Sequence, residues 1–317
     1  MPKPLPVPIR SSDLLRVSGD DRQLRRLAER GIWARVAPGA YVDGDVWRQL
    51  KERERYLTSV HARLLRLPRR VVASHWSAAA AWGFPVPDDW PRKLQIIDPN
   101  CSKTSTTATI LRRAGPIDSH DVCDWDGCSV TRPARTAVDI GLADGFEAGV
   151  LVMDFGLHTG LFEKADLLRQ LEGRRGARRF TSTLTALDFA HPAAESPGES
   201  FSRMAIASRG FPLPTLQEPF SDRDGRIGRV DFYWEESGIV GEFDGLQKYR
   251  DPEVMDSRSA VEVIRDEKRR HARLDAHTRV KRVVRWDYPV ARRPDELARR
   301  LLAVGLARVD GGFRRGR

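Results

Sequence analysis

Three acidic residues, Asp231, Glu242 and Asp244, lie in or directly after two short apolar runs separated by the polar, glycine-containing sequence EESG. That composition is typical of a hairpin loop. If the two runs pair end to end across the loop, Asp231 lies directly opposite Glu242. Asp244 then lies on the same face as Glu242, roughly 7 Å further along the strand. The sequence therefore predicts that three carboxylates share one face of a two-stranded ribbon.

Such crowding has a chemical consequence. Like charges directly across a ladder destabilise it, and a divalent cation with oxygen ligands commonly offsets the repulsion. This favours a metal site formed by Asp231, Glu242 and Asp244. The simpler interpretation is that acidic residues at strand ends mark only a solvated face.

The neighbouring segments have a specific order that favours the metal site. Glu199 stands at the start of a helix predicted in ESPGESFSRMAIASRG, and a strand over 215–220 follows. The turn SDRDGRIG leads into the Asp231 strand, and Lys248 follows the Glu242 strand within about one turn. A helix with Glu, a strand, a strand with Asp, a strand with Glu and then a basic helix is the order of a metal-dependent nuclease core.

These residues, with the later strand RVKRVVRW, resemble the PD-(D/E)XK nuclease superfamily, and within it the domains related to the very-short-patch-repair endonuclease. The resemblance covers about residues 195–306. It implies that Asp231 and Glu242 bind Mg²⁺ or Mn²⁺, that Glu199 is the acid carried by the helix, and that catalysis involves Glu199, Asp231, Glu242 and Lys248. The chain departs from the pattern at Asp244, where the superfamily has lysine, and Lys248 is the nearby substitute.

The charge distribution points to a polyanionic partner. The 317-residue chain has a net charge of +10, and a basic surplus favours nucleic acid through counterion release. An arginine-rich genome composition is the alternative explanation for the surplus. A basic helix and strand follow the acidic hairpin, and we expect Lys268 and Arg269 in that helix to contact DNA. The basic residues of this region are Arg265, Lys268, Arg269, Arg270, Arg273, Arg279, Lys281, Arg282 and Arg285.

A second basic segment lies near the N-terminus. The sequence DDRQLRRLAERG predicts an amphipathic helix, and IWARVAPGAYV predicts a β-hairpin with its turn at Pro-Gly. A basic helix followed by a hairpin is the outline of a winged helix. We therefore predict DNA binding by Arg22, Arg25, Arg26 and Arg35, although an arginine-rich helix is also compatible with a solvated face.

The N-terminal and middle segments resemble AbiEi-type antitoxins, on DRQLRRLAERG, RVAPGAYV and VVASHWSAAAAWGFPVP. Two other possible sites are present in the middle segment. His75 is expected to be a hydrogen-bonded packing residue. Cys123 and Cys128 have the spacing of half a zinc site, but no second Cys/His pair stands at ligand spacing.

The predicted fold is a multidomain α/β protein with a winged helix (1–45), a mixed α/β middle domain (46–190), a restriction-endonuclease-like α/β core with a mixed sheet (191–310) and a basic tail (311–317). No apolar stretch is long enough to cross a bilayer, so no membrane partner is expected. The N-terminus lacks the apolar region of a signal peptide, and three cysteines suit a reducing compartment. We therefore expect a cytoplasmic protein.

Two function classes follow from these patterns. The first is a Mg²⁺- or Mn²⁺-dependent DNA endonuclease that the winged helix directs to its substrate. The second is a noncatalytic DNA-binding regulator of antitoxin type with a degenerate nuclease domain, acting with a partner toxin or as a homodimer. Asp244 at the lysine position favours the second class, and the acidic cluster with nearby Lys248 favours the first.

Overall fold

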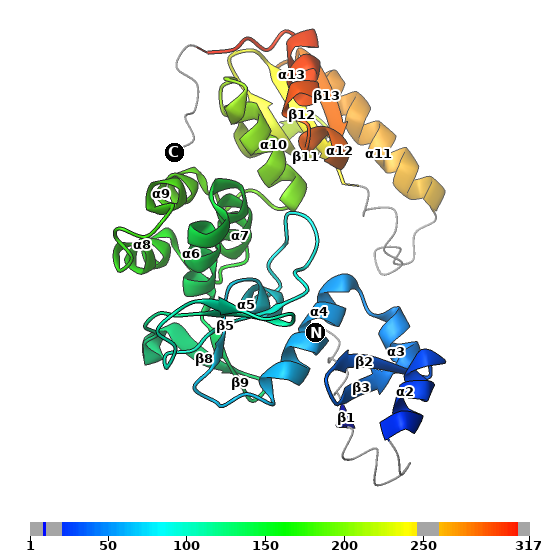
Figure 1. Cartoon of the computed structure of the whole chain (residues 1–317). Coiled ribbons are helices and arrows are strands. Elements are labelled where there is room, and N and C mark those ends of the chain that lie inside the picture. The colour runs from blue at the N-terminus through cyan, green and yellow to red at the C-terminus, as the bar shows by residue number, and fades with distance from the viewer. Residues whose placement is uncertain (1–8, 11–20, 246–259, 310–317) are drawn as a thin grey trace. The chain divides into compact units, whose positions relative to one another are not determined.

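The computed structural model describes residues 9–10, 21–245 and 260–309, with side chains for 24–245, 265 and 267–309. The chain divides into two compact units (Figure 1). The N-terminal unit comprises residues 1–152 and 160–183, and the C-terminal unit comprises 153–159 and 184–317. The fold is mixed α/β, as predicted. The predicted winged helix and most of the predicted middle domain share the N-terminal unit, whereas residues 153–159 and 184–190 of that middle domain belong to the C-terminal unit.

The N-terminal unit begins with the predicted basic helix and hairpin. The hairpin strands form an antiparallel sheet in the order β1-β3-β2. Gly31, with a φ of +74°, ends the helix, and Gly44 lies so close that a Cβ there would be 1.9 Å from the Gly31 carbonyl oxygen. The close approach requires glycine at position 44. The elements are β1 (Ile9–Arg10), α2 (Asp21–Glu29), β2 (Trp33–Ala37), β3 (Ala40–Asp43), α3 (Gly44–Gln49) and α4 (Glu52–Leu64).

A six-stranded mixed sheet with the order β6-β7-β5-β4-β9-β8 forms the rest of this unit, together with helices. Apolar side chains of α4 and α5 pack with those of β4, β5 and β9 in one hydrophobic core. The elements are β4 (Val72–Ala73), α5 (His75–Trp82), β5 (Leu94–Ile97), β6 (Ser105–Thr106), β7 (Ile110–Arg113), the 3₁₀ helix η1 (Ser119–Asp121), β8 (Val122–Trp125), β9 (Cys128–Thr131), α6 (Pro133–Asp144) and α8 (Lys164–Glu172). Helices α7 (Phe146–His158) and α9 (Phe180–Phe189) contribute residues to both units.

The C-terminal unit has a four-stranded mixed sheet in the order β10-β11-β12-β13, with β12 and β13 parallel and the other neighbours antiparallel. The chain therefore runs helix, three strands, helix, strand, as the nuclease resemblance implies. The elements are α10 (Pro197–Ser208), β10 (Thr215–Asp222), β11 (Gly225–Trp234), β12 (Ile239–Asp244), α11 (Ala260–Asp275), β13 (Arg282–Asp287), α12 (Tyr288–Ala291) and α13 (Pro294–Ala303).

Helices α10 and α11 pack on opposite faces of this sheet. On the α10 face, Gly198 lies against the Phe243 ring, where a Cβ would be 1.9 Å from a ring carbon, and the Trp286 indole N–H donates to Ser202 Oγ at 2.7 Å. On the α11 face, Leu274 belongs to a buried cluster that contains Val240 of β12. The two helices thus present their side chains to the sheet from opposite sides, which determines the partners of each acidic residue.

Candidate active site

The β11–β12 hairpin has the predicted register. Trp234 pairs with Ile239 and Phe232 with Gly241, as predicted, but the ladder ends there, and Asp231 is not paired with Glu242. The Asp231 carboxylate accepts a hydrogen bond from the Phe243 backbone N–H at 2.8 Å. The side chain of Asp231 therefore replaces a backbone carbonyl as the hydrogen-bond acceptor for Phe243.

Glu199 is held at the N-terminus of α10. Ser196 caps the helix: its Oγ accepts from the Glu199 N–H at 3.2 Å and donates to Glu199 Oε1 at 2.7 Å. The Glu195 N–H donates to Glu199 Oε2 at 3.0 Å. These bonds orient a carboxylate that is buried in the fold, at the helix end where a negative charge is favoured.

Gln217 of β10 connects Glu199 to Asp231. Its Nε2 donates to Glu199 Oε2 at 3.2 Å and, at the limit of hydrogen bonding, to Asp231 Oδ1 at 3.5 Å. Gln217 also has a φ of +53°, uncommon for a residue with a side chain. Sequence analysis missed Gln217. It stands opposite Asp231 in the β10–β11 register, between the pairs Leu216–Phe232 and Glu218–Val230, so its role depends on how these two strands and α10 pack together.

Burial raises the pKa of Glu199 above its ordinary value of 4.5, and the nearby Asp231 charge raises it further. Hydrogen bonds from Glu195, Ser196 and Gln217 act in the opposite direction. The net increase means that the folded protein binds a proton at Glu199 more tightly than the unfolded chain does.

This pKa shift leads to a testable pH dependence. The stability contributed by protonated Glu199 is fully present below pH 4.5 and is lost as pH rises through the higher folded-state pKa. In metal-free buffer, we expect the melting temperature of the wild type to decline relative to that of Glu199→Gln as the pH increases from about 4 to 7. A pH-independent difference between the two melting temperatures would contradict the assignment.

Glu242 faces a different environment. It is 7% exposed, and Arg270 of α11 donates to its two carboxylate oxygens at 2.8 and 3.4 Å. His271 Nε2 and Arg285 Nε lie 3.8 and 4.0 Å from Glu242 Oε2. The predicted repulsion is therefore offset in the structure by arginine at Glu242 and by donors from Phe243 at Asp231. Groups of the protein itself therefore balance these charges, and the expectation that a cation must balance them is wrong.

Asp244 is exposed at the end of β12. Desolvation raises its pKa, Arg285 lowers it, and Glu242 raises it. Its electrostatic neighbours are therefore those of Glu242. Over the residues described, no three His, Cys, Asp or Glu side chains converge as a metal site, so the predicted triad of Asp231, Glu242 and Asp244 is not assembled.

A cavity of about 670 Å³ opens beside Glu199 and Asp231. Phe243, Tyr288 and the first turn of α10 also line it. Mg²⁺ is typically held by one or two carboxylates, with water and substrate phosphates completing its coordination. Glu199 and Asp231 fit that requirement as a pair, whereas Glu242 is paired with Arg270 and does not line the cavity.

Several predicted site residues lie away from this cavity or outside the residues that the structure describes. Lys248 lies outside the described residues, and so does the side chain of Arg22, whose backbone belongs to α2. Lys268 and Arg269 are exposed on α11. Both side chains are therefore accessible from solvent.

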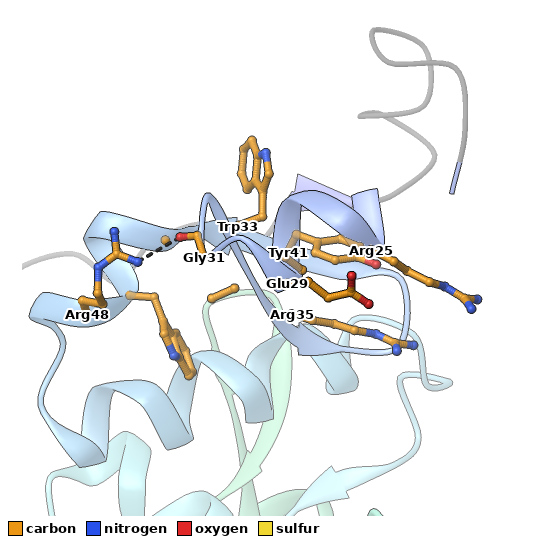
Figure 2. Close-up of a pocket in the computed structure, with 11 residues that line it drawn as sticks. Arg25, Glu29, Gly31, Trp33, Arg35, Tyr41 and Arg48 are labelled. Atoms are coloured by element: carbon orange, nitrogen blue, oxygen red, sulfur yellow. Dashed lines mark hydrogen bonds between the residues drawn. The ribbon is translucent and has the colours of Figure 1, made fainter. Parts of the chain in front are cut away.

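The remaining predicted DNA-binding residues lie on the N-terminal unit. Arg25 and Arg26 of α2 and Arg35 of β2 are all exposed. Figure 2 shows that Arg25 and Arg35 extend toward the same side of the helix and hairpin. Residues from two elements therefore contribute to one basic face.

The other two possible sites, His75 and the cysteines Cys123 and Cys128, lie in the N-terminal unit. His75 is buried, and its Nδ1 lies 3.0 Å from Ser74 Oγ. Burial, followed by the charges of Arg113 and Arg135, lowers its pKa well below the ordinary value, so it is a neutral packing residue. Cys123 and Cys128 lie on the β8–β9 hairpin, and no metal-ligand group includes them in the described part of the chain.

No family model matches the chain. The uncharacterized proteins MT2308 and Rv2248 from two strains of Mycobacterium tuberculosis are each 26% identical over 184 residues, which cover 58% of this chain and 66% of theirs. The crystal structure of the Rv2827c protein from Mycobacterium tuberculosis matches 68% of this chain and 84% of its own, with 16% identity and a TM-score of 0.37. Among the described residues, no helix is long and apolar enough to span a membrane.

Proposed function

We propose that this protein is a Mg²⁺- or Mn²⁺-dependent DNA endonuclease whose N-terminal basic helix and hairpin bind duplex DNA. The observation that carries the proposal is the pair of carboxylates, Glu199 and Asp231, joined through Gln217 at the edge of a cavity. The order of helices and strands in the C-terminal unit supports it, because it is the order of the nuclease superfamily that the sequence resembles. The charge of +10 favours a polyanionic substrate.

Each residue of the proposed site has a defined task. Asp231 and Glu199 would hold the cation, which when bound neutralises charge on the phosphodiester and lowers the pKa of a coordinated water. Gln217 keeps the two carboxylates close together through its amide. Phe243 and Tyr288 supply apolar walls to the cavity and limit the access of bulk water. Glu242 would join as a ligand after release from Arg270, and Lys248 remains the proposed replacement for the missing lysine.

One observation favours the second function class, a noncatalytic DNA-binding regulator with a partner toxin or as a homodimer. Arg270 already neutralises Glu242, one of the predicted metal ligands, and an arginine cannot lose its proton under physiological conditions. A permanent ion pair at this position would leave the acidic site short of a ligand. The nuclease-type fold would then serve only to grip nucleic acid.

The two classes are separated by a cleavage assay. Purified protein is incubated with supercoiled plasmid, single-stranded DNA and mismatched duplex, each with Mg²⁺, Mn²⁺ or EDTA. An endonuclease nicks or linearises plasmid with metal and is inactive in EDTA. Binding of all three substrates with no cleavage under any metal condition would support the regulator instead, and cleavage in EDTA would exclude both metal-dependent chemistry and this site.

DNA binding by the N-terminal unit is tested separately. Changing Arg25 and Arg26 together to alanine should weaken duplex binding and flatten its salt dependence by roughly one to two units of slope, since about one counterion is released per phosphate contact. Cleavage of short oligonucleotides at high protein concentration should persist, because the acidic site belongs to the other unit. The measurement is the dependence of the dissociation constant on salt, by fluorescence anisotropy. An unchanged slope would assign these arginines to a solvated surface.

A further inference from the structure

Two cavities of the N-terminal unit adjoin at a shared residue, Trp47 of α3. The first has a volume of about 540 Å³ and is bounded by α2, β2 and α3 (Figure 2). The second has a volume of about 500 Å³ and lies between α4 and residues 89–92. Because Trp47 lines both, the two cavities adjoin at its side chain, and together we call them the Trp47 groove.

Aromatic rings line the groove along its length. Trp33 and Tyr41 line the first cavity. In the second, Tyr56 and Trp90 stack with their ring centroids 5.3 Å apart and their planes inclined by 23°. Tyr41 and Tyr56 are buried, whereas Trp33, Trp47 and Trp90 are half-buried, so each cavity offers indole surface of the kind on which a nucleobase stacks.

Positive charge surrounds these rings. Six arginines line the two cavities, against three acidic residues, Glu29, Glu52 and Asp89. Arg55 lies over the Trp47 ring, 5.9 Å from its centroid, and donates to the carbonyl oxygens of Trp47 and Arg48. Neutral carbonyl acceptors orient this guanidinium without cancelling its charge. The six arginines are Arg25, Arg35, Arg48, Arg55, Arg63 and Arg92.

One of these arginines has an unsatisfied donor. Arg63 donates through Nη1 to the carbonyl oxygens of Arg92 and Thr109, but its buried Nε has no hydrogen-bond partner in the described structure. Burial lowers the pKa of Arg63. An anion at the second cavity would favour the charged form of Arg63.

We infer that the Trp47 groove binds single-stranded nucleic acid, with unpaired bases against the aromatic rings and phosphates near the arginines. Alternation of aromatic and cationic side chains in a groove is the usual means of binding unpaired nucleotides. Each cavity is within the roughly 300–1,000 Å³ of small-ligand sites, sufficient for about one nucleotide. The bases of a duplex stack on each other and do not present their faces to Trp47. This inference goes beyond the proposed nuclease and is independent of Glu199 and Asp231.

The test uses the full chain in EDTA, so that cleavage has no part in the result. Fluorescence anisotropy compares a labelled dT12 strand, the corresponding U12 strand and a 12-bp duplex. The charge variant carries Arg35→Gln and Arg92→Gln, one exposed arginine from each cavity. Its matched control carries Arg69→Gln and Arg178→Gln, two exposed arginines of the same unit that line neither cavity.

The charge variant should lower the slope of log affinity against log salt by about 1.4 for the single strands, from two phosphate contacts at about 0.7 each. The matched control should leave that slope unchanged. Binding of either dT12 or U12 in this way supports the groove and identifies the sugar that it accepts. Equal losses in variant and control, or losses confined to duplex, would overturn the inference.

A second pair of variants tests stacking. Trp47→Leu should weaken single-strand binding about tenfold or more, while Trp47→Phe, which keeps an aromatic ring, should retain most of the affinity. Trp47 also packs against the cluster containing Val36 and Ala62, so the melting temperature of each variant is measured. If Trp47→Leu fails to fold, the arginine variants decide the question. Equal affinities for folded Leu and Phe variants would exclude stacking at Trp47.

Discussion

Changing Asp231 to asparagine is expected to abolish metal-dependent plasmid cleavage while leaving the fold intact. The change removes the charge that would hold the cation but keeps an oxygen that can accept the Phe243 N–H, at 2.8 Å in the wild type. Metal-ion catalysis supplies several kcal/mol of transition-state stabilisation, so the loss should be at least about a thousandfold. Relief of the repulsion with Glu199 should leave the metal-free protein equally stable or slightly more stable.

Two further variants make the result specific. Asp224→Asn changes an exposed acid in the turn between β10 and β11 and should cleave normally. Glu242→Gln tests whether Glu242 acts as a ligand after leaving Arg270: a loss equal to that of Asp231→Asn would show that it does. Undiminished cleavage by Asp231→Asn, in folded protein, would exclude the proposed metal site. The measurement is the initial rate of plasmid nicking in Mn²⁺.

The largest effect on stability is expected at Asp154, far from Glu199 in sequence but bonded to the same helix. Asp154 Oδ2 lies 2.9 Å from Arg203 Nη1 and accepts from Ser200 Oγ at 2.7 Å, both on α10. The Asp154 side chain is 1% exposed and that of Arg203 is 5% exposed. The His191 N–H donates to the other carboxylate oxygen at 2.8 Å. The site helix is thus anchored by a buried ion pair.

Asp154→Ala should destabilise the C-terminal unit by about 3–5 kcal/mol, because the charge of Arg203 remains buried without its partner. The control is Asp295→Ala, which breaks the exposed pair with Arg209 and should change stability much less. The double change Asp154→Leu with Arg203→Met should recover much of the loss, since apolar residues can replace a buried ion pair. Denaturant unfolding curves measure all three. A loss at Asp154 as small as that at Asp295 would contradict the anchoring role.

The sequence by itself determined the local elements of the C-terminal unit. The alternation of apolar residues and the EESG loop predicted the β11–β12 hairpin and its register, which the pairing of Trp234 with Ile239 confirms. The segment before Glu199 predicted the start of α10, because Ser196 and Pro197 have the local chemistry of a helix N-terminus. The basic helix and hairpin of the N-terminal unit followed from the same short-range signals.

Only the tertiary structure decided which partner each carboxylate has. The sequence placed Asp231, Glu242 and Asp244 on one face and assigned the balance of charge to a cation. In the fold, Gln217 donates hydrogen bonds to both Asp231 and Glu199, while Arg270 forms an ion pair with Glu242. Gln217 is 14 residues from Asp231, and Arg270 is 28 residues from Glu242. Periodicity reports the face on which a side chain lies, but the charges that reach it from other elements depend on how those elements pack.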